Sequence, residues 1–198
     1  MMELLPIKRA LLSVTDKSGL VDLACFLAGA GVELTSTGGT RKVLLDAGLK
    51  VTSVSEVTGF PEMLDGRVKT LHPRIHGGIL ADKDNPAHTE ALARAEIRPY
   101  DMIVVNLYDF AGALAKNLDE AATVEQIDIG GPCLLRAAAK NFASVLVVPD
   151  PEYYPLVIKE LAENNMRAPL DLRRQMARRA FESTARYDGL VASWFAKL

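Results

Sequence analysis

Short apolar runs alternate along the chain with apolar positions spaced as in helices. The run RALLSV at residues 9–14 predicts a first buried strand. A helix is predicted next, because apolar residues lie at positions i, i+3, i+4 and i+7: Leu20, Leu23, Ala24 and Leu27. Gly29 and Gly31 are expected to end this helix. Further strands are predicted at 32–35, 50–54, 102–107 and 144–148, with helices at 41–47 and 86–95. This alternation indicates an α/β fold of three layers, with a mostly parallel sheet and helices on both faces.

Two segments depart from this alternation. Residues 58–80 lack periodicity and are rich in glycine and proline, so we predict a long, ordered functional loop. From Pro169 onward the chain predicts one long, arginine-rich amphipathic helix, whose apolar face is Ala177, Phe181, Ala185, Val191 and Phe195. We expect this helix to pack on the α/β core with its charged face in water. A dimer contact or a linker to a further domain is the alternative.

Length and composition are typical of one globular domain. The chain has 198 residues, of which 49% are hydrophobic and 24% are charged. We therefore expect a single domain over residues 1–198, with a core at about 8–150 and a C-terminal helical extension at 151–198.

Charge and cysteine content exclude several classes of partner. The formal charge of −2 provides no field that would recruit nucleic acid or a membrane surface. No apolar run is long enough to span a membrane, and the N-terminus does not resemble a signal peptide. Cys25 and Cys133 lie in apolar helical patterns, which indicates free thiols and a cytoplasmic protein.

Two polar turns follow the first two predicted strands, and ligands of parallel sheets bind beyond the carboxyl ends of strands. Residues 13–19 (SVTDKSG) place hydroxyls and Lys17 before a helix, which suits either a phosphate or an ordinary N-cap. Residues 36–41 (STGGTR) contain paired glycines that let the backbone approach a ligand, although the ending of a Walker loop is absent. Each turn alone is weak evidence, but two turns at one edge of a sheet favour an anion site.

Residues 125–141 (EQIDIGGPCLLRAAAKN) join a carboxylate, exposed amides and a lysine in one block. Asp128 lies just before a predicted helix start, where an aspartate is usually structural. The amides of Gly130 and Gly131 are expected to be open to a ligand and could hold a developing oxyanion. Lys140 follows about two turns into the helix. The combination of these groups in one block is more specific evidence for a functional site than any one of these residues alone.

Residues 65–73 (DGRVKTLHP) predict a loop that grips an anionic polar ligand, because they carry two fixed cations and a hydroxyl. His72 and His76 have the spacing of two metal ligands, but no cysteine or further histidine accompanies them, so we expect no metal.

Asn106 and Tyr108 end the strongest predicted strand and place an amide and a phenol at the same edge of the sheet. The alternative for Tyr108 is a ring in the core with its hydroxyl in water.

Several long strings resemble IMP cyclohydrolase, the N-terminal domain of the bifunctional purine-biosynthesis enzyme that also carries AICAR transformylase. The matching strings are SVTDKSG (13–19), STGGT (36–40), TGFPEMLDGRVKTLHP (58–73), VNLY (105–108), EQIDIGG (125–131) and LLRAAAKN (134–141). The resemblance runs in register from about residue 8 to 150 and implies the methylglyoxal-synthase-like fold.

The resemblance implies dehydrative ring closure of formyl-AICAR (5-formamidoimidazole-4-carboxamide ribonucleotide) to IMP, the last step of de novo purine biosynthesis, without cofactor or metal. It implies catalytic positions at Lys69, Tyr108, Asp128 and Lys140. It places the nucleotide, with its phosphate on the first two turns, against Ser13, Thr15, Lys17, Thr37, Gly38, Gly39, Thr40, Arg67 and Thr70. Asn106, Gly130 and Gly131 complete the expected substrate contacts. The expected partners are a second copy in a homodimer and a transformylase, as a further domain or a separate protein.

The chain departs from the family at two positions, with Asp109 in place of the usual proline and Phe142 in place of the usual histidine. Asp109 adds a negative charge beside Tyr108. The chain ends where a transformylase domain would begin, so we expect either part of a bifunctional enzyme or a stand-alone cyclohydrolase. Two rival functions remain: methylglyoxal synthase on the same fold, and a non-catalytic nucleotide-sensing module.

Overall fold

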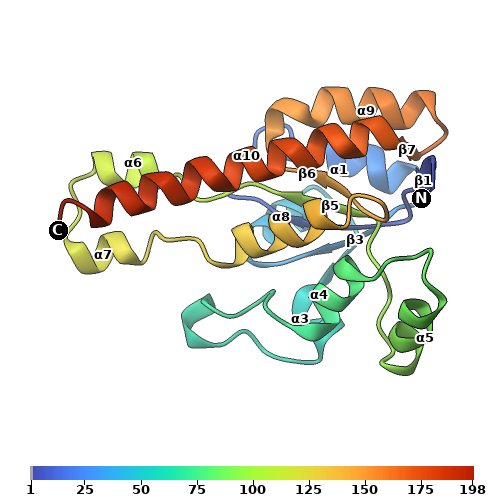
Figure 1. The fold of residues 1–198 in the computed structure, drawn as a ribbon, viewed down its shortest axis with the longest axis horizontal. Helices are drawn as coiled ribbons and strands as arrows, with labels where there is room; N and C mark the ends of the chain where they lie inside the picture. Colours follow the sequence, from blue (N-terminus) through green and yellow to red (C-terminus); the bar gives the residue numbers. More distant parts are fainter. Residues whose placement is uncertain (1) are drawn as a thin grey trace.

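Five parallel strands form the central sheet in the computed structural model, which describes residues 2–198 (Figure 1). Along the chain the strands are β2 (Arg9–Ser13), β3 (Glu33–Ser36), β4 (Val51–Ser53), β5 (Met102–Val105) and β6 (Leu146–Val148). The apolar side chains of β2, β5 and β6 are almost wholly buried, because helices cover both faces of the sheet. The predicted parallel α/β sheet is therefore confirmed.

The order of the strands, β4-β3-β2-β5-β6, creates a switch point between β2 and β5. From β2 the chain moves outward through β3 to β4, and later from β5 to β6 on the other side. The loops that leave β2 and β5 therefore turn in opposite directions, and a crevice opens at the carboxyl ends of these two strands. This edge of the sheet is where the fold favours a ligand.

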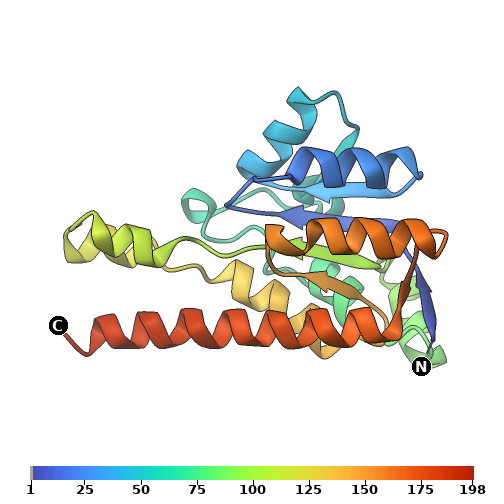
Figure 2. The same cartoon turned by 90° about the horizontal axis from the view of Figure 1, so that it is seen from above.

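Helices form a layer on each face of the sheet (Figures 1 and 2). One layer holds α1 (Leu20–Gly29), α2 (Gly38–Asp46) and α9 (Tyr154–Glu163). The other holds α4 (Pro73–Leu80) and α8 (Gly130–Lys140), and α10 (Leu170–Phe195) runs along α8 and β6. The shorter elements are α3 (Val54–Thr58), α5 (Pro86–Arg94), α6 (Phe110–Ala115), α7 (Glu120–Val124), η1 (Leu64–Gly66) and η2 (Pro151–Tyr153). A small antiparallel sheet pairs β1 (Leu4–Pro6) with β7 (Arg167–Pro169).

The prediction of a loop throughout residues 58–80 is wrong for its last third, which forms α4. Pro73 occupies the first turn of this helix, and His72 is its N-cap, with Nδ1 accepting a backbone N–H at 3.1 Å. Glycine has a low helix propensity, which hid the helix in the sequence. A Cβ on Gly78 would lie 2.9 Å from the Arg98 carbonyl oxygen, so this close contact requires glycine.

The long helix α10 buries a different face from the predicted one. Its buried residues are Leu170, Leu172, Arg173, Met176, Ala177, Ala180, Thr184 and Tyr187. Of the predicted face only Ala177 is buried, whereas Phe181 and Phe195 keep 40% and 52% of their surface exposed. The pattern was misread because the buried stripe contains an arginine and two hydroxyl-bearing residues. Neither α10 nor any other helix within residues 2–198 is long and apolar enough to cross a membrane.

The guanidinium of Arg173 anchors the N-terminal end of α10. The side chain is fully buried and donates hydrogen bonds to carbonyl oxygens of three segments: Met2 and Glu3, Phe142 and Ala143, and Ala168. Burial lowers the pKa of Arg173, and the carbonyl acceptors offset the cost of desolvating its charge. One side chain thus ties α10 to the residues just before β1, to the loop before β6 and to β7.

Candidate active site

A cavity of about 640 Å³ opens at the switch point, beyond the carboxyl ends of β2, β3 and β5. Every predicted site residue except Lys140 lies on its wall. The turns after β2 and β3 supply Ser13, Thr15, Lys17, Thr37, Gly38, Gly39 and Thr40. Three other segments supply Arg67, Lys69 and Thr70, then Asn106 and Tyr108, then Asp128, Gly130 and Gly131. The fold thus gathers five separate segments at one edge of the sheet.

The side chain of Asn106 joins the end of β5 to the turn after β2. Its Oδ1 accepts hydrogen bonds from the backbone N–H groups of Thr15 at 2.6 Å and Asp16 at 2.9 Å. Its Nδ2 donates to the Asp16 carbonyl oxygen at 2.8 Å. Only 7% of Asn106 is exposed. Asn106 therefore shapes the turn that was predicted to receive a phosphate.

The buried hydroxyl of Thr40 fixes the turn after β3 to the turn after β2. It accepts a hydrogen bond from the Val14 N–H at 3.0 Å and donates one to the Val14 carbonyl oxygen at 2.9 Å. Lys17 lies against the second turn, since a Cβ on Gly39 would be 3.9 Å from its Cε. The free N–H groups at the start of α2 and the Lys17 ammonium make this end of the cavity positive. Such an end suits a phosphate.

A tight hairpin presents Lys69 to the cavity. Met63 and Val68 form an isolated antiparallel bridge, so Glu62 and Lys69 become the next facing pair. Glu62 Oε1 lies 2.9 Å from Lys69 Nζ. Gly66, in the turn, has a φ of +89°, and a Cβ there would lie 2.7 Å from Lys69 Cε. The hairpin turn therefore needs glycine for its backbone angle, and a Cβ there would also crowd the flexible ends of the Glu62 and Lys69 side chains.

Arg67, on the same hairpin, forms an ion pair with Glu125. The two side chains are 65% and 52% exposed, and exposed ion pairs contribute only about 0–1 kcal/mol. Both cations of the predicted anion-binding loop thus carry a carboxylate counter-ion from the protein itself. These pairs are weak enough for an anionic ligand to replace.

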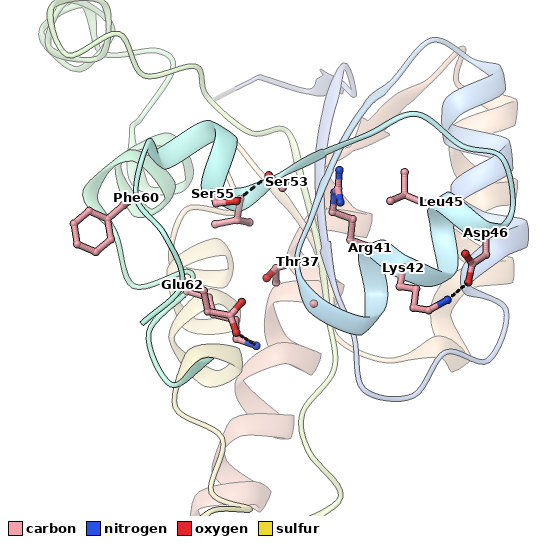
Figure 3. A pocket seen from close by; sticks show the side chains of 12 residues that line it. Thr37, Arg41, Lys42, Leu45, Asp46, Ser53, Ser55, Phe60 and Glu62 are labelled. Atoms are coloured by element: carbon pink, nitrogen blue, oxygen red, sulfur yellow. Dashed lines mark hydrogen bonds and ion pairs between the residues drawn. The ribbon is translucent and has the colours of Figure 1, made fainter. Parts of the chain in front are cut away.

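A second cavity, of about 440 Å³, is drawn in Figure 3. It adjoins the first cavity at Lys69. The two cavities share Thr37, Gly38 and Lys69. Other polar groups of the smaller cavity pair with one another, as Figure 3 shows for Lys42 with Asp46 and Ser53 with Ser55. Glu62 lines only the smaller cavity, whereas Lys69 lines both. Lys69 therefore stands at the boundary, with its counter-ion on the side away from the larger cavity.

Burial raises the pKa of Asp128, and two backbone N–H groups partly offset this effect. Oδ1 accepts a hydrogen bond from the Gly131 N–H at 2.8 Å, and Oδ2 accepts one from the Tyr108 N–H at 3.4 Å. A carboxylate with a raised pKa is suited to accept a proton near neutral pH. The expectation that both glycine amides are open to an oxyanion is wrong for Gly131, because Asp128 occupies its N–H.

Tyr108 lies at the mouth of the cavity with 46% of its surface exposed, so its ring is not part of the core. Thr70 is buried in the cavity wall, where its Oγ1 would be 3.1 Å from a Cβ on Gly130. The hairpin loop therefore packs directly against the start of α8.

Lys140 is the one predicted site residue that the fold leaves away from this cavity. Helix α8 starts at Gly130 on the cavity wall and ends at Lys140, so their Cα atoms are about 15 Å apart at 1.5 Å per residue. Lys140 instead lines a separate cavity of about 680 Å³ between α8 and α10, together with Arg136, Arg174, Arg178 and Phe181. Within one copy of the chain, Lys140 does not act beside Asp128.

The two histidines with metal-like spacing have other surroundings. His72 caps α4, and burial lowers the pKa of His76. Across the part of the chain that the structure describes, no three His, Cys, Asp or Glu side chains cluster to hold a metal ion.

Sequence reasoning missed Glu62 and Glu125, the counter-ions of the two loop cations. A signal existed for Glu62, because residues that flank a short hairpin turn face one another. Glu125 pairs with a residue far away in the sequence, and no local pattern indicates that contact.

Two protein families match the chain, one after the other. The MGS-like domain family matches residues 19–133, and the AICARFT/IMPCHase bienzyme family matches residues 138–198. The first match contains most of the cavity wall, and the second contains α10.

Curated relatives match almost the whole chain. The "Bifunctional purine biosynthesis protein PurH" of Rhodospirillum rubrum is 54% identical over 195 residues, which are 98% of this chain and 37% of the relative. The protein of the same name from Leuconostoc mesenteroides is 54% identical over 190 residues, 96% of this chain and 37% of the relative. The chain thus spans a little over a third of the length of these relatives. A solved structure described as "Crystal structure of ForH" is 34% identical, with a TM-score of 0.85 over 96% of this chain and 97% of that chain.

Proposed function

Because the chain belongs to the MGS-like domain family and continues into a segment of the AICARFT/IMPCHase bienzyme family, we propose that it is an IMP cyclohydrolase. In the proposed reaction the carboxamide nitrogen of formyl-AICAR attacks the formyl carbon, and the new C–N bond closes the second purine ring. The carboxamide nitrogen loses one proton and the formamide nitrogen loses another, while the formyl oxygen takes up two protons and leaves as water to give IMP. The reaction needs a base, an acid and donors to the formyl oxygen, and no redox cofactor or metal.

The nucleotide would bind with its phosphate at the positive end of the cavity. The hydroxyls of Ser13 and Thr15, the Lys17 ammonium and the free N–H groups at the start of α2 supply donors and positive charge there. Arg67 and Thr70 would contact the rest of the nucleotide from the hairpin loop. The cavity volume of about 640 Å³ lies within the usual range for ligand sites, about 300–1,000 Å³.

The reacting end of the substrate would lie between Asp128, Lys69 and Tyr108. Asp128 is proposed as the base that takes a proton from the carboxamide nitrogen. Lys69 and Tyr108 would orient the formyl group and deliver protons to its oxygen, with help from the Gly130 N–H. General acid–base catalysis of this kind contributes about 10²–10⁴-fold.

One observation carries this proposal: the half-buried carboxyl of Asp128, whose pKa is raised, shares one cavity with a lysine, a phenol and a positive end suited to a phosphate. A nucleotide sensor would need the phosphate end but not the three proton-transfer groups beside it.

Conversion of formyl-AICAR to IMP, followed by absorbance, tests the proposal. We expect turnover by the wild type and a loss of about 10²–10⁴-fold in Lys69→Ala and in Asp128→Asn. Lys42→Ala is the matched control, because Lys42 lines only the neighbouring cavity and pairs with Asp46. IMP binding without turnover would favour a nucleotide sensor instead. Formation of methylglyoxal from dihydroxyacetone phosphate would favour the synthase.

We further propose a homodimer in which Lys140 serves the cavity of the second copy. Lys140 lies on an open face between α8 and α10, where Leu80 and Phe181 are 41% and 40% exposed. Mixing Lys69→Ala with Lys140→Ala protein would then restore activity, since each mixed dimer holds one intact site. Random exchange of subunits in a twofold dimer should give about a quarter of wild-type activity. Lack of any recovery in dimers shown to exchange would contradict a role for Lys140 in the second copy.

The partner enzyme and the cellular location of the protein remain predictions. A transformylase, on the same polypeptide or on another, is the proposed supplier of formyl-AICAR. Cys25 and Cys133 are free thiols, in keeping with the cytoplasmic location expected from the sequence.

A further inference from the structure

The hydroxyl of Tyr187 links the C-terminal helix α10 to the loop before α8. It accepts a hydrogen bond from the Asp128 backbone N–H at 2.7 Å and donates one to the Gln126 carbonyl oxygen at 3.3 Å. These two bonds hold the main chain on both sides of Ile127, just where the Asp128 side chain enters the cavity. Tyr187 stands behind the cavity wall, so it acts on the site through this loop.

Packing holds the Tyr187 ring in the position from which its hydroxyl makes both bonds. Tyr187 is 7% exposed, and its ring meets the ring of Phe110 edge-on, with centroids 6.2 Å apart. Phe110 is 1% exposed and also meets Trp194, at 5.9 Å. Phe110 begins α6, which lies alongside the C-terminal half of α10 (Figures 1 and 2). Removal of the hydroxyl alone would therefore leave the ring in place.

The Asp128 carboxylate depends on the same stretch of main chain. Its two oxygens accept N–H groups from Gly131, at the start of α8, and from Tyr108, after β5. Both bonds require the Asp128 backbone to stay fixed between these two elements.

We propose that Tyr187 is a positioning residue, which aims the Asp128 carboxylate at the substrate by holding the Asp128 backbone. This inference rests on the cyclohydrolase function proposed above. It assigns α10 a part in the reaction, although α10 contributes no side chain to the wall of the main cavity among the residues that the structure describes.

The variant Tyr187→Phe tests the proposal, because it removes one oxygen atom from the full chain. We expect kcat for formyl-AICAR to fall roughly 3- to 10-fold, the effect of a lost hydrogen bond. KM should stay within about twofold of wild type, because the phosphate-binding turns are unchanged. Tyr154→Phe is the matched control: Tyr154 is 3% exposed, and within residues 2–198 its hydroxyl has no hydrogen-bond partner. Equal kcat in Tyr187→Phe and wild type would overturn the proposal.

Amide hydrogen exchange supplies a readout that does not need activity. In Tyr187→Phe the Asp128 N–H loses its acceptor, so its exchange should speed up roughly tenfold while amides in the middle of α8 stay protected. Unchanged protection of the Asp128 N–H would refute the contact. A wild type that fails to convert formyl-AICAR would refute the proposed function. Faster exchange would then show only that Tyr187 holds the loop, without a part in this reaction.

Discussion

Replacement of Asn106 by alanine should weaken the turn that is proposed to hold the phosphate. The side chain makes three hydrogen bonds to that turn and is 7% exposed. At about 0.5–1.5 kcal/mol of net stability for each hydrogen bond, the free energy of unfolding should fall by about 1.5–4.5 kcal/mol. At about 2–4 °C per kcal/mol for a chain of this size, the melting temperature should fall by roughly 3–18 °C.

The kinetic effect of Asn106→Ala should lie in KM. The phosphate is far from the bond that forms, so its contacts are equally strong in the ground state and in the transition state. Loss of such uniform binding raises KM and leaves kcat nearly unchanged. We expect a rise in KM for formyl-AICAR of about tenfold, which corresponds to about 1.4 kcal/mol of binding free energy.

Asn141→Ala is a matched control for this experiment. The Nδ2 of Asn141 donates to the carbonyl oxygens of Ile79 at 2.7 Å and Ala81 at 2.9 Å, at the far end of α8. Loss of these two bonds should lower stability by about 1–3 kcal/mol without a change in KM. Thermal unfolding and steady-state kinetics of both variants decide the matter. Wild-type melting temperature and KM in Asn106→Ala would refute the assigned role, and an equal rise in KM in both variants would point to general destabilisation.

Three further changes have definite expected outcomes. Burial raises the pKa of Asp128, and the proposed base must be ionised to act. As the pH is lowered, kcat/KM should therefore begin to fall at a higher pH than an ordinary aspartate, with a pKa of about 3.9, would give, and Asp128→Asn should lack this acid limb of the pH–rate profile. Gly66→Ala should lower kcat, because its Cβ would crowd the paired side-chain ends of Glu62 and Lys69 and shift Lys69. Gly48→Ala should cost only about 1–3 kcal/mol of stability, since Gly48 has a similar φ of +79° with open space around it. Equal kcat in the two variants would contradict this effect on Lys69. Tyr154→Phe should keep or raise the melting temperature, because within residues 2–198 its buried hydroxyl has no partner, and a clear fall would show that this hydroxyl is bound in solution.

The spacing of apolar residues was sufficient to predict the sheet and the two polar turns. Each predicted strand overlaps an observed one. The strands could be predicted because a parallel strand that is buried on both faces is a continuous apolar run in the sequence. Helix α4 was missed because its start is marked by Pro73 and its interior holds Gly77 and Gly78. Glycine usually signals a turn, and only the tertiary contact at Gly78 explains its presence in a helix.

The resemblance named segments that the fold brings to one cavity, but it could not say which of their polar atoms are free to bind a ligand. Asn106 and Thr40 were expected to contact substrate, yet their polar atoms bind the backbone of the first turn. Lys140 was expected beside Asp128, yet the length of α8 separates them. Such facts depend on three-dimensional distances between segments, which neither propensity nor motif order contains.

The boundary between the two matching families falls inside α8, between residues 133 and 138. Asp128 lies before this boundary, whereas Tyr187 and the anchoring Arg173 lie after it. A fragment cut near residue 150 would keep the whole lining of the main cavity and still lose the support of Asp128. Chimaeras that join two relatives within α8 would exchange the loop that carries Asp128 and its support separately. Their activity should therefore depend on whether Tyr187 of one relative still fits the loop at Asp128 of the other, and not only on an intact cavity lining.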